Sequence, residues 1–254
     1  MGACPEGALR VAAVQFKPVK GDVPFSCRAM ASLVDDAGQD ADLVVLPEMA
    51  ATGYVFEHAD DVRRVAEPPR GATFEMLSPI ARGRGTWIVA GFPEDAGEHL
   101  YNSALIIDPE GDLQFVYRKT LLFDSDMHWA SPGRTGYRRF RTLDGSFTVG
   151  ICMDLNDPWF VAWCERQGSE VIAFPTNWVD EGADVWPYWQ RRIARTGSTL
   201  VAANSYGIDG DITFSGRSAI LDAWSVLASA PVTGDVVVRA EIPSRPRSRR
   251  QRRV

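Results

Sequence analysis

Three side chains of different chemistry stand where apolar runs of this sequence stop. Cys152, Glu48 and Lys119 each lie at or directly after a short run of apolar residues. Strand ends and the loops after them are where α/β proteins place reactive groups on a rigid scaffold. A thiol, a carboxylate and an ammonium together supply a nucleophile, a general base and a cation that stabilises negative charge. The pattern therefore predicts covalent catalysis by Cys152 without a metal.

Each of these residues also has a plain structural interpretation. Cysteine is among the most buried residue types, a glutamate after a strand can cap a helix, and a lone lysine is usually a surface residue. Glycine, proline or a short polar residue stands close to Cys152 and to Glu48. Such residues let a backbone turn sharply and present a side chain, which favours the catalytic interpretation when the three are taken together.

The elements that must position these residues alternate between strand and helix along the whole chain. This alternation predicts an α/β architecture. Ten strands with about four helices are too many strands for one doubly wound sheet, so we predict a four-layer αββα sandwich of two mixed sheets with helices on the outer faces. The segment Asp-Pro-Glu-Gly-Asp at 108–112 predicts a hairpin turn between two of the strands. The predicted strands are 9–16, 42–46, 86–92, 103–107, 113–117, 147–152, 171–174, 200–204, 218–221 and 236–242, and the predicted helices are 26–37, 73–82, 158–166 and 185–196.

Length and charge divide the chain into a body and a short basic tail. At 254 residues and 45% hydrophobic content, the sequence predicts a single domain over 1–243. The remaining segment, 244–254, carries six arginines and no acid. Without those six arginines the chain has 21 basic and 33 acidic residues, which gives a net charge of −12. An acidic body is a poor surface for nucleic acid, so we predict no nucleic-acid partner and a disordered tail.

The cysteines and the hydropathy pattern bear on the cellular compartment. Cys4, Cys27, Cys152 and Cys164 are widely spaced, with no CxxC pair and no metal-ligand spacing, so neither a disulfide framework nor a zinc site is predicted. No segment approaches the roughly 18 uncharged apolar residues of a membrane-spanning helix. We therefore expect a cytoplasmic protein with no membrane partner.

The motifs around the three candidate residues resemble those of the nitrilase, or carbon-nitrogen hydrolase, superfamily. The resemblance is carried by Leu-Pro-Glu-Met-Ala-Ala-Thr-Gly-Tyr at 46–54, Tyr-Arg-Lys-Thr-Leu-Leu-Phe at 117–123 and Gly-Ile-Cys-Met-Asp at 150–154, with weaker matches along nearly the whole chain. It implies an αββα sandwich, a Glu48-Lys119-Cys152 triad, no cofactor, and a homodimer or a larger homo-oligomer.

The resemblance also suggests an activity. Met153 and Asp154 after the cysteine resemble the amidase and carbamoylase branches rather than true nitrilases. The amino-acid sequence at 100–105 and 123–129 is similar to that of the protein N-terminal amidases, which deamidate N-terminal Asn or Gln. We therefore predict an amidase for a primary carboxamide, with a peptide N-terminus as the substrate. The alternatives are a small-molecule amidase, an ω-amidase or an N-carbamoyl-amine hydrolase, and then a nitrilase or a non-catalytic scaffold.

The resemblance assigns further roles around the triad. Most relatives carry a second glutamate shortly before the Pro-Gly pair at 132–133, and Asp126 holds that place here, where it would support Lys119 or Glu48. The backbone N–H of Met153 would help to bind the oxyanion. The candidate substrate contacts are Asn177, Trp178, Trp129 and Tyr54.

Overall fold

The structure is a computed structural model that describes residues 7–243, so the predicted disordered tail lies outside the described residues. Two sheets of six strands each make up its centre, and a separate two-stranded hairpin lies at one end. The elements of the described part are, in chain order, β1 (Ala8–Gln15), α1 (Val23–Ala37), β2 (Leu43–Val45), α2 (Ala59–Arg63), α3 (Ala72–Arg84), β3 (Trp87–Ala96), β4 (His99–Ile107), β5 (Leu113–Arg118), η1 (Asp124–His128), β6 (Arg139–Arg141), β7 (Ser146–Val149), η2 (Cys152–Asn156), α4 (Pro158–Gln167), β8 (Val171–Thr176), α5 (Trp186–Ile193), β9 (Thr199–Asn204), β10 (Tyr206–Asp209), β11 (Ile212–Ser215), β12 (Ala219–Leu221), β13 (Val226–Ser229) and β14 (Val236–Pro243).

The two large sheets share one plan. The first has the order β14-β1-β2-β3-β4-β5 and the second β13-β12-β9-β8-β7-β6. In each, three parallel strands form the centre and antiparallel strands flank them. Because β5 is antiparallel to β4, which is antiparallel to β3, the end of β5 lies at the same edge as the ends of β2 and β3.

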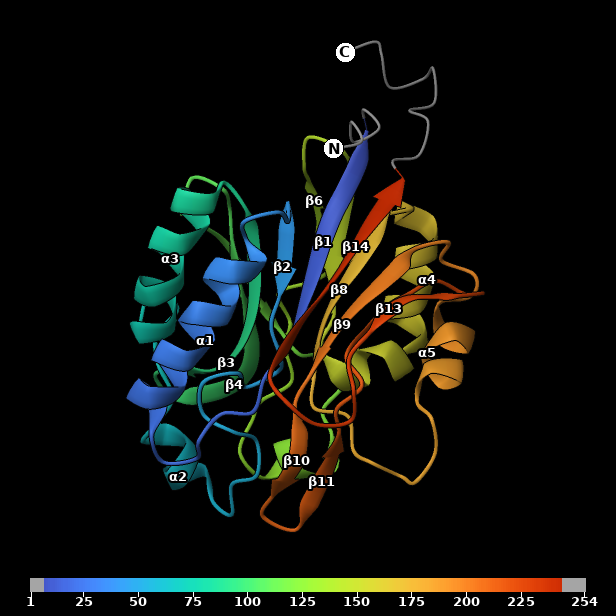
Figure 1. Ribbon diagram of the computed structural model, residues 1–254. Coiled ribbons are helices and arrows are strands. Elements are labelled where there is room, and N and C mark those ends of the chain that lie inside the picture. Colours follow the sequence, from blue (N-terminus) through green and yellow to red (C-terminus); the bar gives the residue numbers. More distant parts are fainter. Residues whose placement is uncertain (1–6, 244–254) are drawn as a thin grey trace.

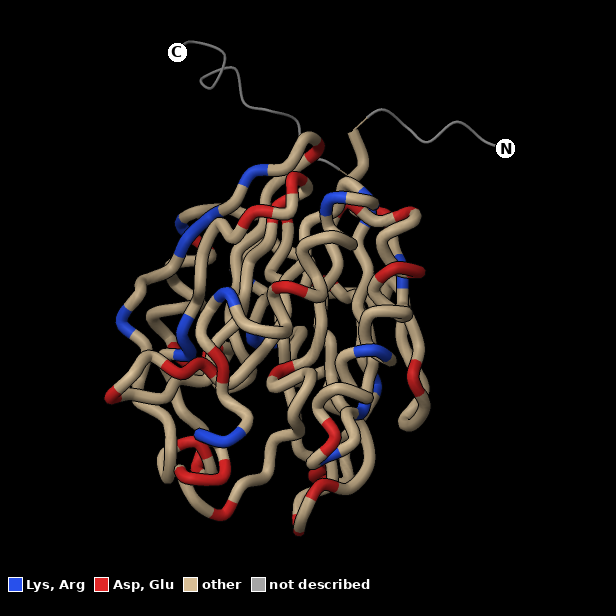
Figure 2. Tube along the Cα trace, turned by 90° about the vertical axis from the view of Figure 1, so that its left-hand side faces the viewer, with Lys and Arg blue, Asp and Glu red and all other residues tan. Residues whose placement is uncertain are grey.

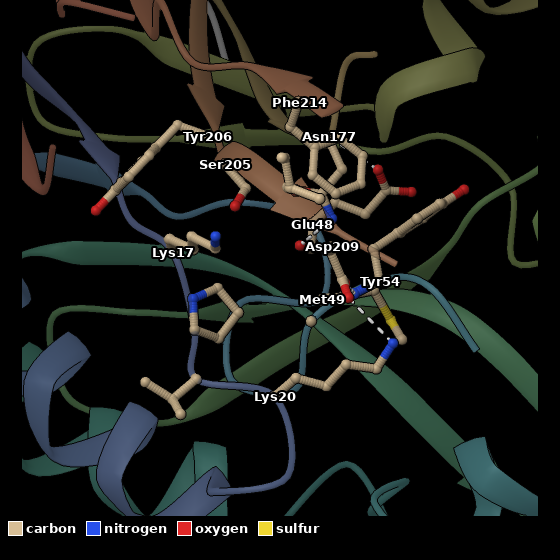
Figure 3. A pocket seen from close by; sticks show the side chains of 14 residues that line it. Lys17, Lys20, Glu48, Met49, Tyr54, Asn177, Ser205, Tyr206, Asp209 and Phe214 are labelled. Carbon is tan, nitrogen blue, oxygen red and sulfur yellow. Dashed lines mark hydrogen bonds and ion pairs between the residues drawn. The ribbon is translucent and has the colours of Figure 1, made fainter. Parts of the chain in front are cut away.

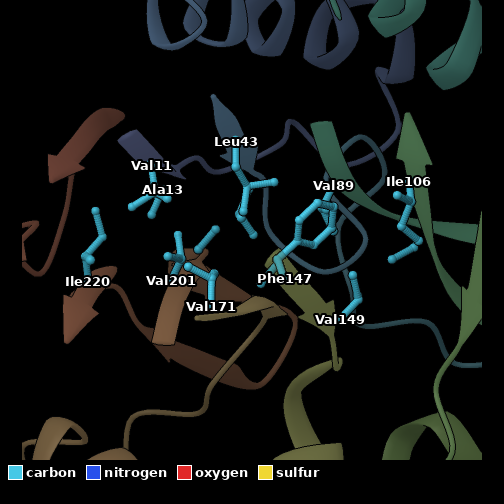
Figure 4. Packing of buried hydrophobic residues seen from close by; sticks show 14 of the residues in the cluster. Val11, Ala13, Leu43, Val89, Ile106, Phe147, Val149, Val171, Val201 and Ile220 are labelled. Atoms are coloured by element: carbon cyan, nitrogen blue, oxygen red, sulfur yellow. The ribbon is translucent and has the colours of Figure 1, made fainter. Parts of the chain in front are cut away.

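Helices cover the outer face of each sheet, which confirms the predicted αββα sandwich. Figure 1 shows α1 and α3 on one side and α4 and α5 on the other. One apolar cluster fills the space between the sheets, where Val11, Leu43 and Val89 face Phe147 and Val171 (Figure 4). Two further clusters lie beneath the helix pairs. Strands buried on both faces explain the continuous apolar runs in the sequence.

Several predicted boundaries were wrong for identifiable reasons. Helix α1 begins at Val23 rather than at 26, because the Asp22 carboxylate caps it by accepting the Phe25 N–H at 3.0 Å and Pro24 fits the first turn. Helix α5 covers Trp186–Ile193 rather than 185–196, and Gly197 follows with a φ of +67°. The strand predicted at 147–152 ends at Val149, because Cys152 has a φ of +43°, which no strand residue adopts.

The predicted hairpin turn between β4 and β5 is confirmed. The two strands pair antiparallel, and Gly111 in the turn has a φ of +83°. The Asp108 carboxylate accepts the backbone N–H groups of Glu110 and Asp112 at 3.1 and 2.8 Å. The sequence analysis missed strands β6, β10, β11 and β13, which are four residues long or shorter.

Within residues 7–243, no helix has the length and apolarity needed to cross a membrane. Figure 2 shows basic and acidic positions interspersed along the chain in that view. The predicted homo-oligomer and cytoplasmic location stay predictions.

Candidate active site

The carboxylate of Glu48 is presented by a tight turn directly after β2. Met49, the next residue, has a left-handed φ of +52°. The turn lies so close to β3 that a Cβ on Gly91 would come within 2.5 Å of the Glu48 Cα. Only glycine allows this approach, so the neighbouring strand is part of what holds Glu48 in place.

The ammonium of Lys119 is fully buried at the end of β5. Its Nζ donates to Glu48 Oε1 at 2.7 Å and to Asp126 Oδ2 at 2.6 Å. The Lys119 backbone is fixed on both sides, since its N–H donates to the Asn102 carbonyl at 2.8 Å and its carbonyl accepts the Gly133 N–H at 2.7 Å. The structure thus brings the predicted base, cation and supporting acid into direct contact.

Asp126, on the short helix η1, joins this network to the loop after β2. Besides Lys119, its carboxylate accepts the Tyr54 hydroxyl at 3.0 Å and the Asn102 side-chain amide at 3.1 Å. The same Asn102 amide donates to Glu48 Oε1 at 2.7 Å. Tyr54, a predicted substrate contact, therefore has its hydroxyl committed to Asp126.

Cys152 is the first residue of the 3₁₀ helix η2, beyond the end of β7. Its φ of +43° is uncommon for a residue with a side chain and costs on the order of 1–3 kcal/mol. The residue is 6% exposed and belongs to the cluster between the sheets. Met153 follows in the first turn of η2, where backbone N–H groups have no partner within the helix. That position suits the predicted role of the Met153 N–H as an oxyanion donor.

Asp154 ties the turn of η2 to the segment after β5. Its buried carboxylate accepts five hydrogen bonds. The Ile151 N–H donates at 2.9 Å from the turn of η2. From the other segment come the N–H groups of Thr120 and Leu121, both at 2.9 Å, and the hydroxyls of Thr120 and Tyr117 at 2.7 and 2.8 Å. One side chain thus fixes the nucleophile relative to the ammonium.

Burial and the neighbouring charges set the protonation states of the triad. Burial raises the pKa of Cys152 to about 12, and the Glu48 carboxylate adds to this while Lys119 opposes it. Burial also raises the pKa of Glu48, and the Lys119 ammonium again opposes this rise. Burial disfavours the charge on Lys119, but the carboxylates of Asp126 and Glu48 raise its pKa well above the usual value. Near neutral pH this favours a neutral thiol, a charged ammonium and a carboxyl group with an elevated proton affinity.

Cys152 opens into a pocket of about 550 Å³. We call it the Cys152 pocket. Two predicted substrate contacts, Asn177 and Trp178, line it. Asn177 also binds Glu48 twice, donating its N–H to Oε2 at 3.0 Å and its side-chain amide to the backbone carbonyl at 2.8 Å. Trp129 lies elsewhere, in a cluster with Tyr54, and lines neither of the two pockets that we describe.

Sequence reasoning assigned no role to two residues of this site. Asn102 lies inside β4 and is fully buried, yet it bridges Glu48 and Asp126. An amide two residues before the apolar run at 104–107 of the strand is the signal that could have marked it. Asp154 marked only the end of the run at Cys152 and, with Met153, the resemblance to the amidase branch. A carboxylate that follows a nucleophile by two residues has no distinctive sequence signal for a bridging role.

Comparisons with known proteins identify the family of the chain. The family described as Carbon-nitrogen hydrolase matches residues 10–251. A protein named Nitrilase from Pyrococcus abyssi is 35% identical over 242 residues, covering 92% of this chain and 89% of its own. The Protein N-terminal amidase of Saccharomyces cerevisiae is 30% identical over 207 residues, 68% of this chain but only 45% of that protein. An omega-amidase of Danio rerio is 28% identical and is matched over 92% of this chain and 88% of its own.

Solved structures of one amidase share the fold. The amidase of Nesterenkonia sp. superposes with a TM-score of 0.81 at 23% identity, covering 96% of this chain and 94% of that one. A mutant of that amidase lacking the cysteine has been solved in complex with butyramide, also with a TM-score of 0.81. A further mutant shows covalent addition of the acetamide moiety of fluoroacetamide at its active-site cysteine.

Proposed function

The chain belongs to the carbon-nitrogen hydrolase family of the nitrilase superfamily, and on this premise we propose that it hydrolyses a primary carboxamide through a thioester on Cys152. The observation that carries the proposal is the buried Glu48–Lys119 pair, joined at 2.7 Å, in the same site as a cysteine that opens into a ligand-sized pocket. The covalent adduct on the cysteine of the Nesterenkonia amidase supports the same choice of nucleophile.

In the first half of the reaction, Glu48 accepts the proton of the Cys152 thiol while the sulfur attacks the amide carbon. The raised pKa of Glu48 makes its carboxylate a stronger base than an exposed glutamate. Collapse of the tetrahedral intermediate breaks the carbon–nitrogen bond. The same proton passes from Glu48 to the departing nitrogen, so ammonia leaves and a thioester remains.

In the second half, Glu48 takes a proton from a water molecule that attacks the thioester carbon. The carbon–sulfur bond breaks, the proton returns to sulfur, and the acid product leaves with the free thiol restored. In both halves the negative charge on the substrate oxygen is stabilised by the Lys119 ammonium and the Met153 N–H. Asp126 keeps Lys119 charged and oriented through its 2.6 Å contact.

We further propose that the amide belongs to the side chain of an N-terminal Asn or Gln. The Cys152 pocket is large for a simple aliphatic amide and carries the carboxylate of Glu181 on its lining. Glu181 forms no ion pair with another described residue, so it is available for the α-ammonium of a peptide. The other acid of this pocket, Asp184, is already engaged with Arg217 at 3.4 Å.

One observation favours a second candidate, an ω-amidase for a small amide that carries its own carboxylate. Arg191 also lines the Cys152 pocket and forms no ion pair with another described residue. Its guanidinium would suit a substrate carboxylate. The relatives named omega-amidase support this alternative.

An ammonia-release assay that compares substrates and two matched variants tests these proposals. The panel contains Asn- and Gln-initiated peptides, the same peptides with an acetylated N-terminus, an ω-amide with a free carboxylate, butyramide and a nitrile. We expect the free-amino peptides to react best, with Glu181→Gln raising their KM at least tenfold and Arg191→Gln leaving it near the parent value. Preference for the ω-amide with loss in Arg191→Gln would replace the peptide proposal, and a nitrile as the sole substrate would contradict the amidase.

A further inference from the structure

A second pocket, of about 370 Å³, lies on the other side of Asn177 from Cys152. We call it the Lys17 pocket. It is formed by the loop after β1, the loop after β2 and the β10–β11 hairpin, and Asn177 is the one residue on the linings of both pockets. Its volume falls within the roughly 300–1,000 Å³ of small-molecule sites. Glu48 and Asn177 of the candidate active site are also on its lining, but Cys152 and Lys119 are not.

The basic residues of the chain are distributed in a way that singles out this pocket. Of 27 basic residues only three are lysines, namely Lys17, Lys20 and Lys119. Lys119 belongs to the buried catalytic network, and the other two both line the Lys17 pocket. A lysine differs from an arginine in offering a compact point charge instead of a planar fork. Lys17 is half-buried, whereas the Lys20 side chain is 43% exposed, so Lys17 is the more confined of the two.

One of these two ammonium groups forms no ion pair within the described part of the chain, although the Asp235 carboxylate accepts the backbone N–H of the same residue at 3.3 Å. Lys20 forms an ion pair with Asp209 at 3.0 Å, and the other Asp209 oxygen accepts the N–H groups of Tyr54 and Val55. Lys17 forms no ion pair there. The carboxylate of Glu48 does not balance it, because its side chain is 0% exposed and is paired with Lys119. The lining thus carries one positive charge without an ion-pair partner in that part of the chain.

A hydrogen-bonding group without a partner lies beside that charge. Ser205 is 5% exposed, and its hydroxyl makes no hydrogen bond to another described residue. Figure 3 shows the Ser205 hydroxyl and the Lys17 ammonium on the same side of the pocket, whereas the Tyr206 hydroxyl points away from them. Tyr206 is engaged with Asp235 at 3.0 Å. The Ser205 hydroxyl is therefore free to donate to a ligand that enters the pocket.

Apolar side chains stand among polar ones on the rest of the lining, where Glu48, Asp209 and Asn177 also lie. Met49, Phe214 and Ile208 contribute to the lining, and Met49 and Phe214 are also members of one hydrophobic cluster. A ligand that fills this space therefore needs an acceptor group at one end and an apolar stem at the other. Inorganic anions satisfy only the first requirement.

We propose that the Lys17 pocket binds a small organic carboxylate, with the carboxylate group on the Lys17 ammonium and the Ser205 hydroxyl and the apolar stem against Met49 and Phe214. The site is distinct from the Cys152 pocket. Binding there involves no turnover, so the proposal stands or fails independently of the amidase reaction.

Calorimetric titration tests the site. The ligands, butyrate and inorganic phosphate, are titrated separately at constant ionic strength. The proteins are the parent chain, Lys17→Met, Ser205→Ala and Arg191→Met. The last is the matched control, because it removes one unpaired cation from the Cys152 pocket while leaving the Lys17 pocket intact. Circular dichroism of each variant without ligand establishes that it is folded.

We expect butyrate to bind the parent and Arg191→Met alike, to bind Lys17→Met at least tenfold more weakly, and to bind Ser205→Ala more weakly than the parent. Phosphate should bind the parent less tightly than butyrate, because it has no apolar stem. Three outcomes would overturn the proposal: no saturable butyrate binding to the parent, equal binding to folded Lys17→Met and Ser205→Ala, or weakening in Arg191→Met alone. The last would place the carboxylate in the Cys152 pocket.

Discussion

The two sheets contribute to the candidate active site in different ways. The first sheet and its loops supply Glu48, Asn102, Lys119 and Asp126, which are joined to one another by contacts of 2.6 to 3.1 Å. The second sheet supplies Cys152, whose thiol lies beside the Thr176 side chain and the Asn177 backbone, and both oppose the rise of its pKa. Its position depends on a strained backbone and on Asp154, two residues further along.

This difference indicates how the reaction is divided between the two halves of the molecule. The proton-handling groups are assembled before substrate arrives, so little reorganisation is needed when charge develops. Burial keeps the thiol protonated, so in the proposed reaction it stays neutral until Glu48 takes its proton. In the proposed reaction, a preformed acid–base network thus acts on a nucleophile that is positioned but not ionised.

The largest expected effect comes from removing the nucleophile. Cys152→Ala should abolish turnover while leaving the fold intact, because alanine has no greater difficulty than cysteine with the positive φ at this position. An ammonia-release assay measures the loss of turnover, and circular dichroism tests whether the variant is folded. Intact-mass spectrometry of the parent with a slow substrate should place the acyl group on Cys152. An adduct on Cys27 or Cys164 instead would refute covalent catalysis at this site.

The next largest effect concerns the shared proton carrier. Glu48→Gln should lower the rate roughly 100-fold or more, the usual scale for loss of a general acid–base. Lys119 would keep Asp126 as its ion partner, so the protein should still fold. Single-turnover kinetics should show slowing of both acylation and deacylation. If acyl-enzyme accumulated at the parent rate, Glu48 would act only in the second half of the reaction.

A smaller effect is expected at Asp126, whose charge matters more than the length of its stem. Asp126→Asn should lower kcat/KM at least tenfold, about 1.4 kcal/mol of transition-state stabilisation, because the ammonium loses a charged partner. Asp126→Glu should retain much of the activity if η1 can shift. Steady-state assays of the two variants side by side rank their kcat/KM values. An Asp126→Asn variant as active as the parent would show that the preassembled network does not need this carboxylate.

The smallest effect is a change in pH dependence. Glu48 must be ionised to act as a base, and its pKa is raised by burial and further by Asp126. The acid limb of the kcat/KM profile should therefore lie above the pH at which an exposed glutamate titrates. Removing the negative charge in Asp126→Asn should lower the pKa of Glu48 and move that limb to lower pH. A limb that stayed in place or moved to higher pH would argue against electrostatic coupling between the two carboxyl groups.

Much of the fold could be predicted because burial leaves a direct trace in the sequence. Strands buried on both faces appear as continuous apolar runs, which is why the central strands of both sheets were found. The hairpin β10–β11 was missed because only its last two residues, Phe214 and Ser215, are buried, which leaves no continuous apolar run. Strand β6 was missed because two of its three residues are arginines.

The sequence by itself determined the chemical groups of the proposed reaction, because Glu48, Lys119 and Cys152 are reactive types at or near the ends of apolar runs. Only the tertiary structure decided how they are held. Asn102 and Asp154 lie far along the chain from some of the groups that they bridge, and the β10–β11 hairpin closes the Lys17 pocket from a distant part of the sequence. The physical reason is that hydrogen bonds and cavities depend on distances of a few ångströms between segments, which the packing of the two sheets fixes and residue order along the chain does not.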